Sequence, residues 1–232
     1  MPVTFTVLVT IAVAVASLFE IIPTFLIKSN VPTIASVKPY TPLELYGRDM
    51  YIREGCVNCH SQQIRPLRYE TERYGEYSKP GESVYEHPFL WGSKRNGPDL
   101  AREGGKYPNL WHVTHFNNPR DIVTGSLMPA YPHFLKDQID WAVIQPRINV
   151  MAMLGVPYGD AVTKAEAMAR EQAATVAADI EKNGGPANLQ ERDIVAIVAY
   201  IQRLGQDIKL ANANPAAPRT PAAPAQVART TP

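Results

Sequence analysis

The stretch Cys56-Val57-Asn58-Cys59-His60 is the part of this chain around which the rest is expected to fold, because it is a C-x-x-C-H pattern. In this pattern two thiols bond to the vinyl groups of a haem, and the adjacent imidazole reaches the iron. Two intervening residues match the separation of the vinyl groups across one edge of the porphyrin. The chain has only these two cysteines, so a disulfide framework is impossible. The pattern predicts one covalent haem c, attached at Cys56 and Cys59, with His60 as an axial ligand of the iron.

Two other uses of a closely spaced cysteine pair fit this chain poorly. A structural zinc site needs four ligands, and His112 and His115 lie much farther along the chain than the second ligand pair of a zinc finger. A thioredoxin-like dithiol would need a βαβ environment, and no strand pattern is visible. Haem attachment is therefore the favoured use of the pair.

The sixth ligand of the iron is expected from a loop on the opposite face of the haem. Met128 follows Gly125-Ser126-Leu127 and precedes Pro129, so its soft thioether lies in a fixed, non-helical stretch. We predict Met128 as this ligand, and packing in the core is the alternative use of the methionine. A bis-histidine haem is also open, with a second imidazole from one of His112, His115 and His133.

The turn Asn96-Gly97-Pro98-Asp99-Leu100 offers a partner for the first ligand. Carbonyl groups in such a turn have no regular backbone partners. The carbonyl of Pro98 is predicted to accept a hydrogen bond from Nδ1 of His60, which would orient the ring and raise its basicity. An ordinary surface turn is the alternative. Arg95 and Trp111 fit equally well as haem-edge residues or as a surface arginine and a core tryptophan.

The N-terminal segment is long and apolar enough to span a membrane. Val3 to Phe19 contains no charged residue, and the apolar character resumes from Ile21 to Ile27. As a helix this stretch covers roughly 37 Å, against about 30 Å of hydrocarbon. A cleaved signal peptide is the alternative, but the segment lacks a basic n-region and exceeds the usual apolar length. We predict a transmembrane anchor over residues 1–28, in which Glu20 either contacts a partner subunit or snorkels at the helix end.

The remaining sequence predicts an all-α fold. Thr41 and Glu44 are spaced as a capping box, with Pro42 at the first helical position, for a helix that runs to about Gly55. Residues 61–110 are expected to be mostly loop, because glycine and proline interrupt every periodic run. Further helices are predicted at 111–117, at 119–124 and at 163–182.

A last helix is predicted after Asn188, which is expected to act as its cap with Glu191 as partner and Gly205 at its end. The domain organisation is then an anchor at 1–28, a connector at 29–40, a haem domain at 41–209 and a disordered Ala/Pro-rich tail at 210–232. The formal net charge is +1, from 23 Lys and Arg against 22 Asp and Glu. No nucleic-acid partner is expected, because the basic footprint of such binders is missing.

Several motifs together resemble class I cytochrome c over most of residues 41–205. They are a helix leading into the C-x-x-C-H pattern, Gly97-Pro98-Asp99-Leu100, Met128-Pro129, and a last helix with Ala199-Tyr200 and Leu204-Gly205. The resemblance implies helices wrapped around one haem.

A more specific set of motifs resembles the mono-haem subunit II of the cbb-type haem-copper cytochrome c oxidases, the C family of bacterial terminal oxidases. The motifs are the apolar N-terminus with Glu20-Ile21-Ile22-Pro23, the segment 56–64, Tyr85-Glu86-His87-Pro88-Phe89, and Ser126-Leu127-Met128-Pro129-Ala130-Tyr131. The resemblance implies a single-pass protein in the lipid bilayer of the bacterial inner membrane, with its haem domain in the periplasm. It also implies electron transfer from a di-haem cytochrome c subunit to the haem b and copper centre of the catalytic haem-copper oxidase subunit I.

On this interpretation the chain serves an oxidoreductase, a proton-translocating complex, without reducing oxygen itself. His/Met ligation leaves no open position on the iron. Two alternatives stay open: a free-standing membrane-anchored cytochrome c that shuttles electrons, and a haem-binding sensor with an open or labile site.

Overall fold

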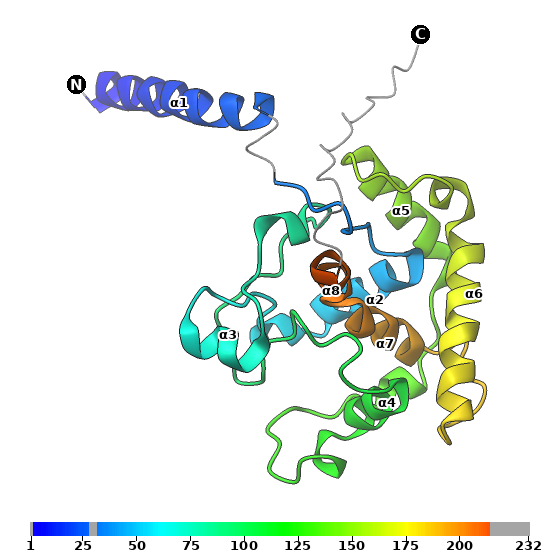
Figure 1. Ribbon diagram of the computed structural model, residues 1–232. Helices are drawn as coiled ribbons and strands as arrows, with labels where there is room; N and C mark the ends of the chain where they lie inside the picture. Colours follow the sequence, from blue (N-terminus) through cyan, green and yellow to red (C-terminus); the bar gives the residue numbers. More distant parts are fainter. Residues whose placement is uncertain (1, 28–31, 214–232) are drawn as a thin grey trace.

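The structure is a computed structural model that describes residues 2–27 and 32–213. Its elements are helices, and within these two ranges there is no strand, so the predicted all-α fold with an N-terminal membrane-type helix is confirmed (Figure 1). The α-helices are α1 (Pro2–Leu26), α2 (Pro42–Arg53), α3 (Arg68–Tyr74), α4 (Asn109–Asn117), α5 (Ile144–Met153), α6 (Ala161–Lys182), α7 (Asp193–Arg203) and α8 (Gln206–Ala213). Short 3-10 helices are η2 (Cys56–Asn58), η3 (Pro80–Ser83), η4 (Pro119–Asp121), η5 (Pro132–Leu135) and η6 (Trp141–Val143).

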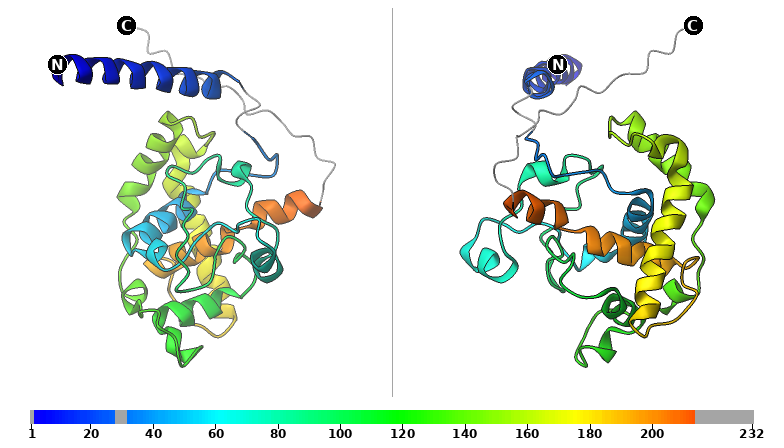
Figure 2. Two further views of the ribbon diagram at one scale, coloured as in Figure 1. Left: turned by 90° about the vertical axis from the view of Figure 1, so that its left-hand side faces the viewer. Right: turned by 45° about the vertical axis from the view of Figure 1, so that its right-hand side comes forward.

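Helix α1 extends away from the folded domain and exposes its apolar side chains along its length (Figures 1 and 2). Its apolar stretch, Pro2–Thr24, has 23 residues. At about 1.5 Å per residue this is enough to cross the hydrocarbon core of a bilayer. Among the residues that the structure describes, α1 is the one helix that could cross a membrane.

Helix α2 begins with the capping box that the sequence predicts. Oγ1 of Thr41 accepts from the backbone N–H of Glu44, and the Glu44 carboxylate accepts from the backbone N–H of Thr41 at 2.9 Å. Pro42 occupies the first turn, where its missing N–H costs nothing. The helix ends at Arg53, and Gly55 follows with φ of +73°, a left-handed conformation that suits glycine. The turn at Gly55 leads directly into η2, which carries Cys56.

The core is built where α2 crosses α7. The approach is close enough that a Cβ on Gly47 would lie 2.1 Å from the carbonyl oxygen of Ala196. Around this crossing Tyr51 and Tyr200 are buried, with ring centroids 5.4 Å apart. The crossing therefore depends on glycine at position 47, and it fixes the C-terminal end of α2, from which the cysteine motif continues.

Helix α6 packs against α2, α5 and α7 along a stripe of alanines. The stripe recurs at every fourth position and is fully or nearly fully buried, and its members are Ala161, Ala165, Ala169, Ala173 and Ala177. Small side chains at this spacing let the helices approach closely. The helix matches the prediction at its C-terminus and begins two residues earlier than expected.

Several helix boundaries predicted from the sequence are wrong. Helix α7 is preceded by Arg192, and Asn188 lies in a turn with φ of +60°, so it does not cap the helix. The carboxylate of Glu191 instead accepts from Nε1 of Trp141 at 2.6 Å. The helix predicted at 119–124 is the single 3-10 turn η4. Helix α3 lies inside the stretch expected to be loop, and α5 was not predicted.

Helix α8 changes the predicted C-terminal boundary. Residues 210–213 form its last turn, so the tail expected from residue 210 begins too early, and residues 214–232 lie outside the described part. The helix is held because Ile208 is buried and Asp207 forms an ion pair with Arg203 at 2.5 Å. Asp207 also accepts from the backbone N–H of Lys38 at 3.0 Å, which ties the connector to α8. Of the connector predicted at 29–40, the structure describes residues 32–40.

Candidate functional site

The cysteine motif forms a tight turn at the end of α2. The backbone N–H groups of Cys59 and His60 both donate to the carbonyl oxygen of Cys56, at 3.1 and 3.0 Å. Both cysteines are free thiols; Cys56 is buried and Cys59 is half-buried. Burial raises the pKa of the Cys56 thiol to about 12. The turn thus presents two free thiols and one imidazole from five consecutive residues.

The turn at 96–100 lies against this motif and is hydrogen-bonded to it and to the following Ser61. The backbone N–H of Gly97 donates to the Cys59 carbonyl at 3.0 Å, and that of Leu100 donates to the Ser61 carbonyl at 2.9 Å. Nδ1 of His60 lies 2.8 Å from the carbonyl oxygen of Pro98, the pair named from the sequence. A hydrogen on Nδ1 and a carbonyl acceptor leave Nε2 as the lone-pair nitrogen.

Glycine at position 97 is required by the imidazole of His60. A Cβ there would lie 2.3 Å from Cε1 of the ring and 2.8 Å from both ring nitrogens. Contacts under 3 Å of this kind do not occur, so any side chain at position 97 would displace the ring. The turn therefore fixes His60 by a hydrogen bond and by direct packing against the Gly97 backbone.

A buried network of charges fastens the turn to the rest of the domain. The guanidinium of Arg95 donates to Glu70 at 2.7 Å, to the hydroxyl of Ser61 at 2.8 Å and to the Gln63 carbonyl at 2.7 Å. Asp99 accepts from the Ser61 hydroxyl at 2.7 Å. The Glu70 side chain is fully buried. Arg95 is thus largely buried and held by carboxylates, so it is not the surface arginine of the second interpretation, and its place at a haem edge stays a prediction.

The segment that carries Met128 also lies beside the cysteine motif. The pKa of Tyr131 is raised to about 12, first by burial and then by the neighbouring Cys56 and Cys59 thiols. The backbone N–H of Tyr131 donates to the Phe116 carbonyl at 2.8 Å, which anchors the segment to α4. Met128 is partly buried against the core, whereas Leu127 is 90% exposed.

Of the three alternative histidines, two lie on α4 next to an aromatic stack. Trp111 is stacked between Tyr107 and His115, with ring centroids 4.0 and 4.7 Å away. Burial, and then the charge of nearby His60, lower the pKa of His115. Burial lowers the pKa of His112 to about 4. The third histidine, His133, lies 3.4 Å from the carboxylate of Glu54.

The residues present fit a haem. Nδ1 of His115 and Nε2 of His112 are buried and have no hydrogen-bond partner in the described ranges, and unpaired buried nitrogens are costly. Two thiols and an imidazole with a free nitrogen lie together close by. Thiols that bond to vinyl groups and an imidazole that binds iron are the donor set that covalent haem requires.

The sequence matches one protein family over most of its length. The model of the cytochrome c oxidase mono-haem subunit, FixO, matches residues 1–208. The chain belongs to the FixO family. A comparison with curated proteins gives no match. The resemblance to the mono-haem subunit of cbb-type oxidases is therefore confirmed, and with it one haem, a role in electron transport and membership of an oxidase complex with other subunits.

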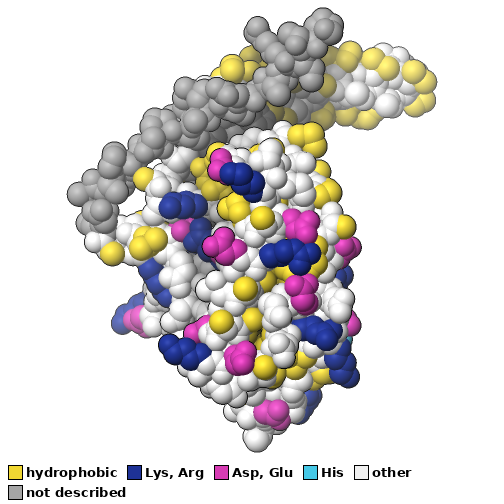
Figure 3. Space-filling model, turned by 90° about the vertical axis from the view of Figure 1, so that its right-hand side faces the viewer, with side chains coloured by type: hydrophobic (Ala, Val, Ile, Leu, Met, Phe, Trp, Pro, Cys, Tyr) yellow, Lys and Arg dark blue, Asp and Glu magenta, His cyan; other side chains and the backbone are white. Residues whose placement is uncertain are grey.

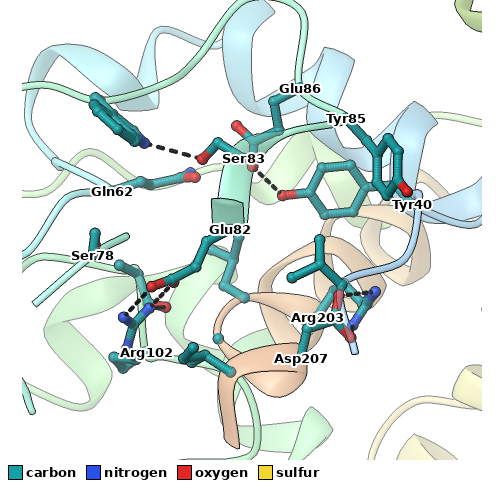
Figure 4. A pocket seen from close by; sticks show the side chains of 16 residues that line it. Tyr40, Gln62, Ser78, Glu82, Ser83, Tyr85, Glu86, Arg102, Arg203 and Asp207 are labelled. Carbon is teal, nitrogen blue, oxygen red and sulfur yellow. Dashed lines mark hydrogen bonds and ion pairs between the residues drawn. The ribbon is translucent and has the colours of Figure 1, made fainter. Parts of the chain in front are cut away.

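Two open pockets lie near these segments of the FixO-family chain. One, of about 250 Å³, lies behind the His60 turn and is lined by α3 and by residues 95–98. The other, of about 70 Å³, lies between the connector, the segment 78–91 and α8 (Figure 4). In it the hydroxyl of Tyr40 donates to Glu86 at 2.8 Å, and burial raises the pKa of Glu86. Arg102 and Arg203 are paired with Glu82 and Asp207 at its other walls.

The sequence did not indicate Glu70, Ser61 or Asp99 as part of the site. Glu70 is 25 residues from Arg95 along the chain, so no spacing rule joins them. One signal could have indicated Asp99, because it directly follows Pro98 in the turn predicted to contact His60.

Proposed function

We propose that this chain relays electrons through one covalently bound haem c within a cbb-type terminal oxidase. Cys56 and Cys59 would form the thioether bonds, and His60 and Met128 would be the axial ligands of the iron. A bound haem supplies one-electron redox chemistry. The observation that carries the proposal is the hydrogen bond between His60 and Pro98, because it leaves Nε2 of an oriented imidazole free beside two free thiols.

The protein groups around His60 determine how that imidazole behaves. Pro98 accepts the Nδ1 hydrogen, which holds the tautomer with its lone pair on Nε2 and makes that nitrogen more basic. Gly97 keeps the ring from rotating, because its backbone lies against the ring. Arg95 and Asp99 hold the turn in place through Ser61. The site is therefore fixed before an electron arrives, and little of it has to move when the charge changes.

Met128 is favoured over the three histidines as second ligand by their surroundings. His133 pairs with Glu54. His112 is buried in α4, edge-on to Trp111, with ring centroids 5.2 Å apart. His115 is stacked on Trp111. Met128 lies in a short loop that Ser126 braces by accepting from the backbone N–H of Met128 at 3.2 Å, and its ring-free thioether is not stacked on an aromatic side chain among the described residues.

The partners and the location are proposed on the family relationship. The haem domain would lie in the periplasm of a bacterial inner membrane, with α1 as a single-pass anchor in the lipid bilayer. Electrons would arrive from a di-haem cytochrome c subunit and leave to the haem-copper subunit I. With both axial positions filled by protein groups, the chain itself would not bind or reduce oxygen, so that reaction belongs to subunit I.

The test is purification of the complex from membranes, with a reduced-minus-oxidised spectrum and pyridine haemochrome quantitation. The proposal expects c-type and b-type haem together, and re-oxidation of the c-type haem by oxygen only while subunit I is present. A chain that purifies with c-type haem alone would make it a free-standing electron shuttle. Rapid carbon monoxide binding by the reduced c-type haem would indicate an open iron and a sensor.

A further inference from the structure

Glu86 differs from the other carboxyl groups of the pocket between the connector and α8. Glu82 pairs there with Arg102 at 2.7 Å, and Asp207 pairs with Arg203 at 2.5 Å. Within the described ranges Glu86 has no ion pair of this kind, and its carboxyl accepts a hydrogen bond from the hydroxyl of Tyr40 at 2.8 Å (Figure 4). A carboxyl that is removed from water and lacks a cationic partner favours its protonated form. Glu86 is therefore suited to bind and release a proton.

The groups that face Glu86 come from four elements. Burial raises the pKa of Glu86 above its usual value, and the charge of Glu82 on η3 adds to this effect. The hydrogen bond from Tyr40 in the connector and the charge of Arg48 on α2 lower it and only partly offset burial. Burial also raises the pKa of Tyr200 on α7, so this phenol stays neutral. Glu86 is thus the group in this cluster whose charge can change.

Three packed tyrosine rings connect Glu86 to the cysteine motif. The ring of Tyr40 packs edge-on against Tyr200, with centroids 5.5 Å apart, and Tyr200 packs against Tyr51 at 5.4 Å. The hydroxyl of Tyr200 accepts from the side-chain amide of Gln62 at 2.9 Å, and Gln62 lies two residues after the C-x-x-C-H pattern. Charges interact more strongly through such a packed interior than through water. A change of charge beside the cysteine motif therefore acts on Glu86.

Carboxylates on the surface of the domain are in a different position. Figure 3 shows Asp and Glu side chains interspersed with Lys and Arg on the face that carries α5 and α6. On these helices Glu166 pairs with Arg170 at 2.9 Å, and Arg147 pairs with Asp49 at 3.0 Å. Solvent and salt screen exposed charges from a distant redox centre. Their protonation is therefore insensitive to an electron at the haem.

The open pocket gives Glu86 a source of protons. Its volume of about 70 Å³ has room for several water molecules, at roughly 10–15 Å³ each. Its lining is polar and includes the hydroxyl groups of Ser78 and Ser83 and the carboxylate of Glu82. Water held by such groups can pass a proton between the solvent and the carboxyl of Glu86.

We propose that Glu86 binds one proton from water in the pocket when the haem is reduced and releases it when the haem is oxidised. This inference rests on the proposed haem function. The electron comes from the electron donor of the chain and the proton from solvent, so reduction adds no net charge to the domain.

The two events favour each other. An added negative charge makes a carboxylate hold its proton more tightly, and by linkage a protonated Glu86 favours the reduced haem. The midpoint potential should therefore fall as the pH rises through the titration of Glu86.

The test is redox titration of the c-type haem in the purified complex from pH 5 to 9, with haem quantified as the pyridine haemochrome. The proposal expects the midpoint potential of the unsubstituted protein to fall with rising pH, and Glu86→Gln to lose most of that dependence. Glu72→Gln is the matched control, because Glu72 forms an exposed pair with Arg68 on α3. This variant should keep the pH dependence of the unsubstituted protein.

Two further variants retain the carboxyl and move its titration in opposite directions. Tyr40→Phe removes the hydrogen bond that lowers the pKa of Glu86, so the fall in potential should shift to higher pH. Glu82→Gln removes a repelling charge, so the fall should shift to lower pH. These shifts test the proposal even if Glu86→Gln fails to fold, and unshifted curves in both variants would overturn it.

Infrared spectroscopy reports the proton directly. Reduction should add the carbonyl stretch of a protonated carboxyl to the difference spectrum, and Glu86→Gln should lack this band. A band that persists in Glu86→Gln, or equal pH dependence in haem-bearing Glu86→Gln and unsubstituted protein, would overturn the proposal. A chain without haem would contradict the proposed function, whereas a haem-bearing chain whose potential does not change with pH would contradict this inference alone.

Discussion

The imidazole of His60 is fixed by Pro98, whose carbonyl oxygen lies 2.8 Å from Nδ1. One face of the same ring lies against Gly97, and the two residues belong to one turn. Because that turn is joined to Ser61 and through Arg95 to Glu70, the orientation of one imidazole depends on residues spread over three segments.

Replacement of Gly97 by alanine should displace the ring of His60. The new Cβ would lie 2.3 Å from Cε1, so either the ring or the turn must move and the hydrogen bond to Pro98 must weaken. A less basic and less oriented imidazole stabilises the oxidised iron less well, so the midpoint potential should change, and haem occupancy should fall. Redox titration measures the change. Gly92→Ala is the control, because a Cβ there meets nothing within 4 Å; equal potentials in the two variants would refute the packing argument.

Replacement of Met128 by histidine should keep the haem attached and lower its midpoint potential. Methionine favours the reduced iron relative to imidazole, so a second imidazole stabilises the oxidised state. Redox titration of the purified variant checks the shift, and Met168→Leu on α6 serves as the control for a methionine that is partly exposed. If the potential of Met128→His equals that of the unsubstituted chain while His115→Leu changes it, the second ligand is His115.

Replacement of Glu70 by glutamine should make the free energy of unfolding less sensitive to low pH. Arg95, by hydrogen bonding, and then Arg65 lower the pKa of Glu70 well below its usual value, although burial opposes them. In the unfolded chain this carboxyl has a pKa of roughly 4.3. The stabilisation is therefore complete above that pH and is lost as the pH falls below it. Unfolding followed by circular dichroism from pH 7 to 3 should show a smaller loss in the variant than in the unsubstituted chain.

The same experiment gives a second comparison at pH 7. Glu70→Gln should lower the free energy of unfolding by about 3–5 kcal/mol, because it removes the closer of the two buried carboxylates that pair with the Arg95 guanidinium. Glu72→Gln is the matched control on the same helix, since Glu72 forms an exposed pair with Arg68 and exposed pairs contribute about 0–1 kcal/mol. Similar losses for the two variants would mean that the buried network does not hold the turn.

Replacement of Gly47 by alanine should destabilise the crossing of α2 and α7. The added Cβ would lie 2.1 Å from the Ala196 carbonyl oxygen, so the two helices must separate. Overpacking of this kind costs about 1–3 kcal/mol, and the thermal midpoint should fall. Gly125→Ala, at a position where a Cβ meets nothing within 4 Å, should leave the midpoint unchanged. An unshifted midpoint in Gly47→Ala would show that the crossing can relax.

The sequence allowed the features that depend on local patterns to be predicted. The capping box of α2 and the positions of helices α6 and α7 follow, at least approximately, from short spacings. The pairing of His60 with Pro98 joins residues 38 apart, and it was predicted from the free carbonyls of the 96–100 turn and the partner that an iron-bound imidazole needs. Periodicity and capping rules describe interactions within one helix, and this is why these helices could be predicted.

Features that depend on long-range contacts were not predictable in the same way. Helix α8 is short and polar, and its position depends on contacts of Asp207 with the connector about 170 residues earlier. Helix α3 lies among glycines and prolines and supplies Glu70 to Arg95. Asn188 had the side chain of a cap, but the chain turns there with a left-handed φ and the helix starts five residues later. In each case tertiary contacts outweighed the local signal.

The most direct test of the central claim is whether haem stays with the chain after the protein is denatured. The full chain is purified, denatured in acid and analysed by intact mass and by the pyridine haemochrome spectrum, beside the Cys56→Ser, Cys59→Ser double variant. The account predicts one c-type haem per denatured chain and none in the double variant. Haem that separates from the denatured chain, or an unsubstituted chain whose mass is that of the polypeptide alone, would contradict it.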